Sequence, residues 1–95
     1  MRENRNNQYR PEQLEFAKKL RLERPDSDID TEYHVIYQYD DEVRHALLDV
    51  VDITRKDAFR LNGPIHFSSS KQILKDKIQK AGLEIVGWNV IDIFT

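Results

Sequence analysis

The sequence of 95 residues contains no cysteine, only three glycines and three prolines, and no long apolar run. Without cysteine, neither a disulfide framework nor a thiolate metal site can form. Nothing in it resembles a glycine-rich phosphate-binding loop. The amino terminus lacks the apolar core of a signal peptide, and no segment reaches membrane-spanning length. We therefore expect a cytoplasmic protein that makes no use of a membrane.

The composition indicates a globular domain with many charges. Hydrophobic residues make up 39% of the chain and charged residues 34%. A domain of this size buries about 60–65% of its unfolded surface, which is enough for independent folding. We predict a flexible basic arm over residues 1–9 and a single folded domain over residues 10–95.

Charge is distributed unevenly along the chain. Residues 1–25 have a net charge of +3, residues 26–57 of −7 and residues 58–95 of +2. Separation of this kind favours electrostatic steering of a partner over general affinity for nucleic acid. An ordinary solvated surface with uneven patches is the alternative interpretation.

The amino-terminal half contains a predicted helix and a predicted strand. Pro11 followed by Glu12 is a typical helix start, and Pro25 ends the amphipathic helix that begins there. Residues 33–39 are mostly aromatic or β-branched, which predicts a strand.

The last third of the chain predicts a strand, a helix and a second strand. Residues 65–67 form a short apolar run, and Ser69 with Gln72 fits a capping box at the start of a helix. We expect this helix to end at Gly82, because glycine readily takes the left-handed conformation at that position. The most strand-like stretch of the chain follows, over residues 83–94.

Two intermediate segments permit alternatives. Residues 43–53 match the helical template after an acidic start, and we favour a helix; a strand that pairs back after a hairpin turn at 40–42 remains open. Residues 58–61 and 64–67 predict two short strands about an Asn-Gly turn. A short helix that ends at Gly63 is the alternative there.

The favoured elements follow the order of a helix and then β-α-β-β-α-β. This is an α+β fold of ferredoxin-like order preceded by an amino-terminal helix. Two alternatives stay open: an α+β fold with an amino-terminal hairpin, and a winged-helix variant with paired helices at 43–51 and 55–61. Because ferredoxin-like order hosts many unrelated functions, it assigns none.

Aromatic and acidic residues mark a candidate protein-binding site. The tyrosines share one face of the predicted strand, and the acids follow directly after it. Tyrosine is favoured at protein interfaces because it joins apolar area to a polar tip. Packing into the core, or stacking of single-stranded bases, would also explain the tyrosines. The candidate residues are Tyr33, Tyr37, Tyr39, Asp40, Asp41 and Glu42.

Basic residues on the first and last predicted helices mark a candidate nucleic-acid-binding site. If both groups faced one way, they would form a surface that contacts phosphates. A solvated helix surface is the simpler interpretation, because Lys and Glu interleave on the first helix. The candidate residues are Arg10, Lys18, Lys19, Arg21, Lys71 and Lys75.

No residue pattern indicates catalysis. Ser68, Ser69 and Ser70 precede a helix and lack the glycines of a nucleophile elbow, so capping explains them. Glu42 and His45 have the i, i+3 spacing of helical carboxylate metal sites, which need that unit twice. We expect no catalytic residue, no bound metal and no cofactor.

These observations favour a small regulatory or inhibitory protein, without enzymatic activity, that binds another protein. The alternative is a nucleic-acid-binding accessory protein. We also expect a homodimer, because the first helix and a long carboxy-terminal strand leave more apolar edge than a short domain covers by itself.

Overall fold

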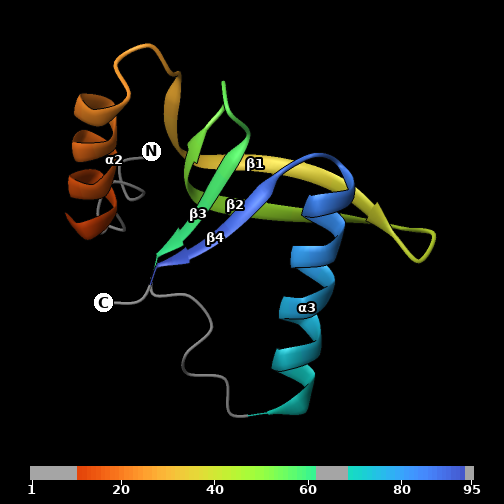
Figure 1. Cartoon of the computed structure of the whole chain (residues 1–95). Helices are drawn as coiled ribbons and strands as arrows, with labels where there is room; N and C mark the ends of the chain where they lie inside the picture. The colour runs from red at the N-terminus through yellow and green to blue at the C-terminus, as the bar shows by residue number, and fades with distance from the viewer. Residues whose placement is uncertain (1–10, 62–68, 94–95) are drawn as a thin grey trace, which may run out of the picture.

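The computed structural model describes residues 11–61 and 69–93 (Figure 1). These residues form an α+β fold, as the sequence predicts. The bounds of its elements are α2 Pro11–Glu23, β1 Ile29–Tyr39, β2 Glu42–Asp52, β3 Asp57–Leu61, α3 Ser70–Ile85 and β4 Asn89–Ile93.

The described strands form one mixed, four-stranded sheet in the order β1-β2-β3-β4. The first three strands are successive antiparallel neighbours, whereas β4 runs parallel to β3. A parallel neighbour requires a crossover connection, and α3 lies in that connection.

The segment 43–53, expected as a helix, lies almost entirely in strand β2. Asp40 and Asp41 have φ angles of 57° and 62°, as the two central residues of a type I′ hairpin turn require. The chain therefore reverses onto β1, and its alternate residues Ala46 and Leu48 enter the core. The helix prediction is wrong here, so the ferredoxin-like order is not confirmed. The alternative with an amino-terminal hairpin describes β1 and β2.

The strand predicted over 58–61 is confirmed as β3, which also excludes the winged-helix alternative for 55–61. The predicted Asn-Gly turn and the strand at 65–67 lie outside the described residues. The predicted final strand is shorter than expected, since β4 covers Asn89–Ile93.

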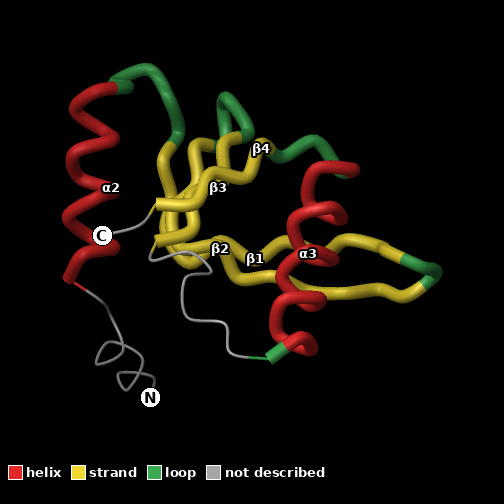
Figure 2. The backbone as a smooth tube through the Cα atoms, turned by 60° about the horizontal axis from the view of Figure 1, so that its bottom comes forward, coloured by secondary structure: helices red, strands yellow, loops and turns green. Residues whose placement is uncertain are grey.

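Helices α2 and α3 cover opposite faces of the sheet, as two views of the chain show (Figures 1 and 2). Each helix contributes to its own buried cluster, and neighbouring residues of β3 point into different clusters. On the α3 side the cluster is Val35, Tyr37, Ala46, Leu48, Val51, Ala58, Leu83, Trp88 and Val90. On the α2 side it is Ala17, Leu20, Ile29, Val50, Phe59 and Leu61.

Helix α3 begins where the sequence predicts. The Ser69 hydroxyl accepts a hydrogen bond of 3.2 Å from the backbone N–H of Gln72 and so caps the helix. Within the described parts of the chain, neither helix has the length and apolar character needed to cross a membrane.

Helix α3 ends at Ile85, three residues beyond the predicted end at Gly82. The helix continues through Gly82, and the residue in the left-handed region is Gly87, with φ 100°. The Gly87 N–H donates to the Glu84 carbonyl at 3.0 Å, and the Trp88 N–H donates to the Leu83 carbonyl at 2.9 Å. These are the two hydrogen bonds of a Schellman motif. The motif was expected correctly, but at the wrong glycine.

Candidate protein-binding surface

A two-stranded segment extends beyond the rest of the sheet. β3 pairs with only the last three residues of β2, and the Leu61 N–H donates to the Asp49 carboxylate at 2.9 Å. Among the described strands, residues 33–39 and 42–48 therefore pair only with each other. We call these two stretches and the turn between them the hairpin arm (Figure 2).

One face of the hairpin arm is covered by the carboxy-terminal end of α3. Val35 and Leu48 point to this side and are 8% and 1% exposed. They belong to the same cluster as Leu83 and Trp88. This face is therefore part of the core.

The opposite face of the hairpin arm is open. Successive side chains of a strand point to opposite sides, so the residues between the buried ones share this face. Its aliphatic members are Ile36, Val43 and Leu47, which are 58%, 66% and 64% exposed. We call the following set the open hairpin face: His34, Ile36, Gln38, Val43, His45 and Leu47.

The strand register brings these six side chains into one patch. Cross-strand neighbours on one face lie about 4.5–5.5 Å apart at Cβ. The cross-strand pairs are His34–Leu47, Ile36–His45 and Gln38–Val43. The two imidazoles also meet diagonally, with His34 Nε2 at 2.9 Å from His45 Nδ1. Apolar and imidazole surfaces thus form one continuous area.

The tyrosines predicted to bind a partner lie on the covered face. Tyr37 is only 6% exposed, and a Cβ atom on Gly82 would overlap its ring. Tyr33 and Tyr39 are half-buried against the same cluster, and the Tyr33 ring centroid is 5.8 Å from that of Trp88. Tyr37 therefore packs in the core, which is the alternative left open for the tyrosines, and its burial does not support a role as a partner-binding residue. Partner binding by Tyr33 and Tyr39 stays a prediction.

The predicted acidic residues Asp40, Asp41 and Glu42 are exposed at the tip of the hairpin arm. Glu42 accepts a hydrogen bond of 2.9 Å from Arg44 Nη2. Asp40 and Asp41 place negative charge at the end of the open hairpin face. The acidic part of the predicted site is accessible, although its neighbours are aliphatic residues and histidines.

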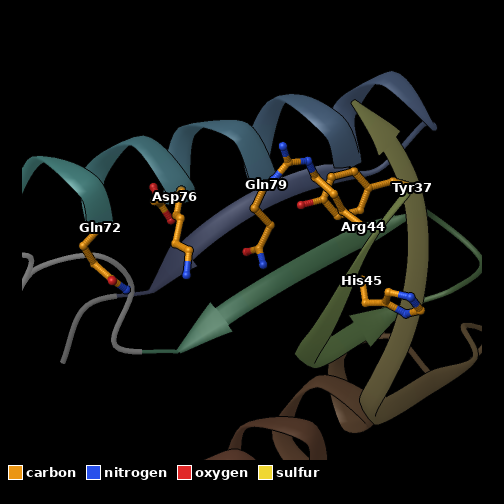
Figure 3. Close-up of a pocket in the computed structure, with 7 residues that line it drawn as sticks. Tyr37, Arg44, His45, Gln72, Asp76 and Gln79 are labelled. Atoms are coloured by element: carbon orange, nitrogen blue, oxygen red, sulfur yellow. The ribbon is translucent and has the colours of Figure 1, made fainter. Parts of the chain in front are cut away.

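A cleft of about 390 Å³ lies between the hairpin arm and α3 (Figure 3). Asp76 in its wall pairs with Arg60, which also donates to both oxygens of Asp92 at 2.7 and 3.0 Å. Burial by itself would lower the pKa of Arg60, but these two carboxylates raise it overall. Asp76 therefore links α3 to the sheet through its ion pair with Arg60 on β3. The cleft is lined by Tyr37, Arg44, His45, Gln72, Lys75, Asp76 and Gln79.

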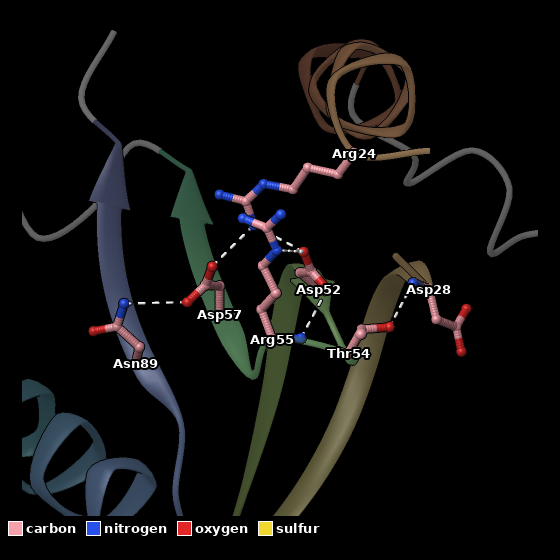
Figure 4. Close-up of polar contacts among 7 residues, drawn as sticks. All are labelled: Arg24, Asp28, Asp52, Thr54, Arg55, Asp57 and Asn89. Atoms are coloured by element: carbon pink, nitrogen blue, oxygen red, sulfur yellow. Dashed lines mark hydrogen bonds and ion pairs between the residues drawn. The ribbon is translucent and has the colours of Figure 1, made fainter. Parts of the chain in front are cut away.

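A second polar cluster lies where α2 meets the sheet (Figure 4). Arg24 Nη1 donates to the carboxylates of Asp52 at 2.8 Å and Asp57 at 2.9 Å. Asp52 is fully buried and accepts a further bond of 3.0 Å from the Arg55 N–H. Burial by itself would raise the pKa of Asp52, but these donors hold it below its ordinary value. A buried charge with such partners stabilises the docked helix, so we assign the cluster a structural role.

The candidate nucleic-acid-binding residues do not form one surface. Those on α2 and those on α3 are exposed, but the two helices lie on opposite faces of the sheet (Figure 1). Arg10 lies outside the described residues. Nucleic-acid binding stays a prediction, and each basic group would have to act separately. The described candidates are Lys18, Lys19, Arg21, Lys71 and Lys75.

Within residues 11–61 and 69–93, no group of three or more His, Asp or Glu side chains could hold a metal ion. Glu42 and His45, expected on one side of a helix, point to opposite faces of β2 because they are three positions apart in a strand whose side chains alternate. The contact between His34 and His45 comes instead from the strand register.

Comparisons with protein-family models, with curated proteins and with solved structures found no match for this chain. Val43 and Leu47 were missed as surface residues because 43–53 was expected to be a helix, and Ile36 because only the tyrosine face of its strand was considered. Their signal was the alternation of Val43, His45 and Leu47, which becomes visible once the hairpin is accepted.

Proposed function

We propose that this chain is a non-enzymatic regulatory or inhibitory protein that binds another protein through the open hairpin face. One observation carries the proposal: Ile36, Val43 and Leu47 are each more than half exposed within a single patch. Isolated exposed apolar residues are common, but a contiguous patch marks an interaction site.

The chemistry of the patch favours protein over nucleic acid. The open hairpin face contains no Lys or Arg, and Asp40 and Asp41 lie at its end. Phosphate groups would meet negative charge there, without the cations that neutralise them. An apolar centre with a polar and charged rim is instead the arrangement found in protein interfaces.

Burial of this patch contributes a modest binding free energy per residue. Covering the exposed part of one aliphatic side chain contributes on the order of 1 kcal/mol. Replacing Leu47 by lysine removes this contribution and also places a charge in the interface, so we expect partner affinity to fall about tenfold or more.

The test is capture of a partner from host extract by the immobilised full chain. The variants are Leu47→Lys and, as a matched control, Leu22→Lys, which replaces a leucine that is 80% exposed on α2. Wild type and the control should recover the same protein in the presence of nuclease, and Leu47→Lys should lose it. Equal recovery by both variants, or loss of every partner after nuclease treatment, would contradict the proposal.

A further inference from the structure

The outer edge of β1 is the longest exposed strand edge in the described part of the chain. β1 lies at one end of the sheet and spans 11 residues, whereas β4 at the other end spans five. Strand edges that do not pair with another chain are usually protected from pairing by lysine, proline, a bulge or short length. Residues 33–39 contain no Lys, Arg, Asp, Glu, Pro or Gly. This stretch therefore lacks the residue types that usually protect a strand edge.

The available edge is limited at both ends. Asp30 and Glu32 carry charge at the start of β1, and Glu32 has φ 49°, which departs from extended geometry. Asp40 begins the turn at the other end. The part that can accept another strand is therefore residues 33–39.

We propose that this edge pairs antiparallel with β1 of a second copy of the chain, with Ile36 of each copy on the two-fold axis. The segment is chemically self-complementary in this register. Aromatic–aromatic, aromatic–β-branched and apolar pairs are favourable cross-strand neighbours, and no like charges face each other within it. The pairs, each between one copy and its partner, are Tyr33–Tyr39, His34–Gln38, Val35–Tyr37 and Ile36–Ile36.

The register follows from overlap and charge. Centring on Ile36 pairs all seven residues of the neutral stretch, whereas moving the axis to Val35 or Tyr37 leaves five paired within it. Directly beyond the paired stretch, Glu32 would face the partner's Asp40, and repulsion between them ends the pairing. Moving the axis to a position between two residues would place side chains of the covered face opposite those of the open face.

The dimer would have a larger binding surface than one chain. In this register the α3 helices of both copies lie on the same side of a continuous sheet, and their open hairpin faces meet at Ile36. Dimerisation does not depend on the proposed function, because it uses backbone groups at the edge of β1. Loss of partner capture in the Leu47→Lys variant would leave it unaffected.

The first test is the mass of the full chain by sedimentation equilibrium between about 1 and 100 μM. Wild type should reach twice the chain mass of 11.3 kDa. Ile36→Lys should stay monomeric, because it places two lysines on the axis, while Leu47→Lys on β2 should still dimerise. Thermal melts check that the variants are folded, as expected for a residue that is 58% exposed. A monomeric wild type over the whole range would overturn the proposal.

The second test fixes the register by oxidation. The chain has no cysteine, so Ile36→Cys introduces its only thiol. Directly opposed residues of antiparallel strands have Cα atoms about 4.5–5.5 Å apart, within disulfide range. In Gln38→Cys the two thiols would be four residues apart along the strands, about 13 Å, which is beyond that range. We expect Ile36→Cys to cross-link at least about tenfold faster. Equal rates in the two variants would overturn the proposed interface.

Discussion

The ring of Tyr37 packs directly against the backbone of Gly82 in α3. A Cβ atom on Gly82 would overlap ring carbons Cδ2 and Cε2, and would come within 3.3 Å of Cγ. Tyr37 lies on the covered face of the hairpin arm, so this contact between α3 and β1 depends on the missing side chain of Gly82. It explains why a glycine occupies the interior of a helix despite its low helix propensity.

We expect Gly82→Ala to lower the free energy of unfolding by up to about 2 kcal/mol. Alanine favours the helix by about 1 kcal/mol, but overpacking against the ring costs about 1–3 kcal/mol. Urea unfolding measures the change. In the Tyr37→Ala background, where the ring is absent, the same substitution should become stabilising. A stabilising effect in the wild-type background would show that the contact is not tight.

Burial raises the pKa of Tyr37 above its ordinary value of 10.0, while Arg44 opposes the shift. The unfolded chain therefore releases the phenolic proton first. The contribution of the protonated phenol to the free energy of unfolding is fully present below pH 10.0 and is lost as the pH rises through the folded-state pKa. Above this pH, we expect the free energy of unfolding of wild type to fall relative to that of Tyr37→Phe. Denaturant unfolding at several alkaline pH values measures it, and parallel curves would contradict the prediction.

Leu47 and Leu48 are neighbours that the hairpin places in opposite environments. Leu48 is 1% exposed and Leu47 is 64% exposed. We expect Leu48→Ala to cost about 2–5 kcal/mol of stability, and Leu47→Ala less than about 1 kcal/mol. Chemical unfolding at low protein concentration keeps dimerisation from affecting the comparison. Similar costs for the two variants would contradict this prediction, and a larger cost for Leu47→Ala would support the helical interpretation of 43–53.

Asp52 should make the fold sensitive to acid. Its pKa in the folded chain is below the ordinary value of 3.8, so its contribution is present above that pH and is lost as the pH falls through the folded-state pKa. Asp52→Asn leaves Arg24 without its buried partner, and we expect it to cost about 3 kcal/mol at neutral pH. The variant should also lose less stability on acidification than wild type. Asp26→Asn, at an exposed position, is the control and should change little.

Replacing Lys18, Lys19 and Arg21 together by alanine should leave partner capture unchanged. These residues lie on α2, away from the hairpin arm (Figure 1). If the chain instead bound nucleic acid through them, the triple variant would lose that binding and its salt slope would flatten by up to about three phosphate equivalents. Binding to mixed-sequence DNA and RNA at two salt concentrations decides between the two outcomes.

Local chemistry was enough to predict several elements. The proline at the start of α2 and the serine cap of α3 act within one helical turn, so the sequence determines them directly. The β-branched and aromatic residues of 33–39 likewise predict β1 without knowledge of its partner. The α+β class follows from these elements together.

Tertiary structure decided the features on which the proposed function depends. The apolar residues of 43–53 fit helical spacing as well as strand spacing, and only pairing with β1 selects the strand. That choice places Leu47 on the surface instead of in the core, and brings His34 to His45. The role of Gly82 also depends on a distant residue, since its missing side chain makes room for the ring of Tyr37. These positions are set by contacts between segments far apart in the chain, which local residue preferences do not encode.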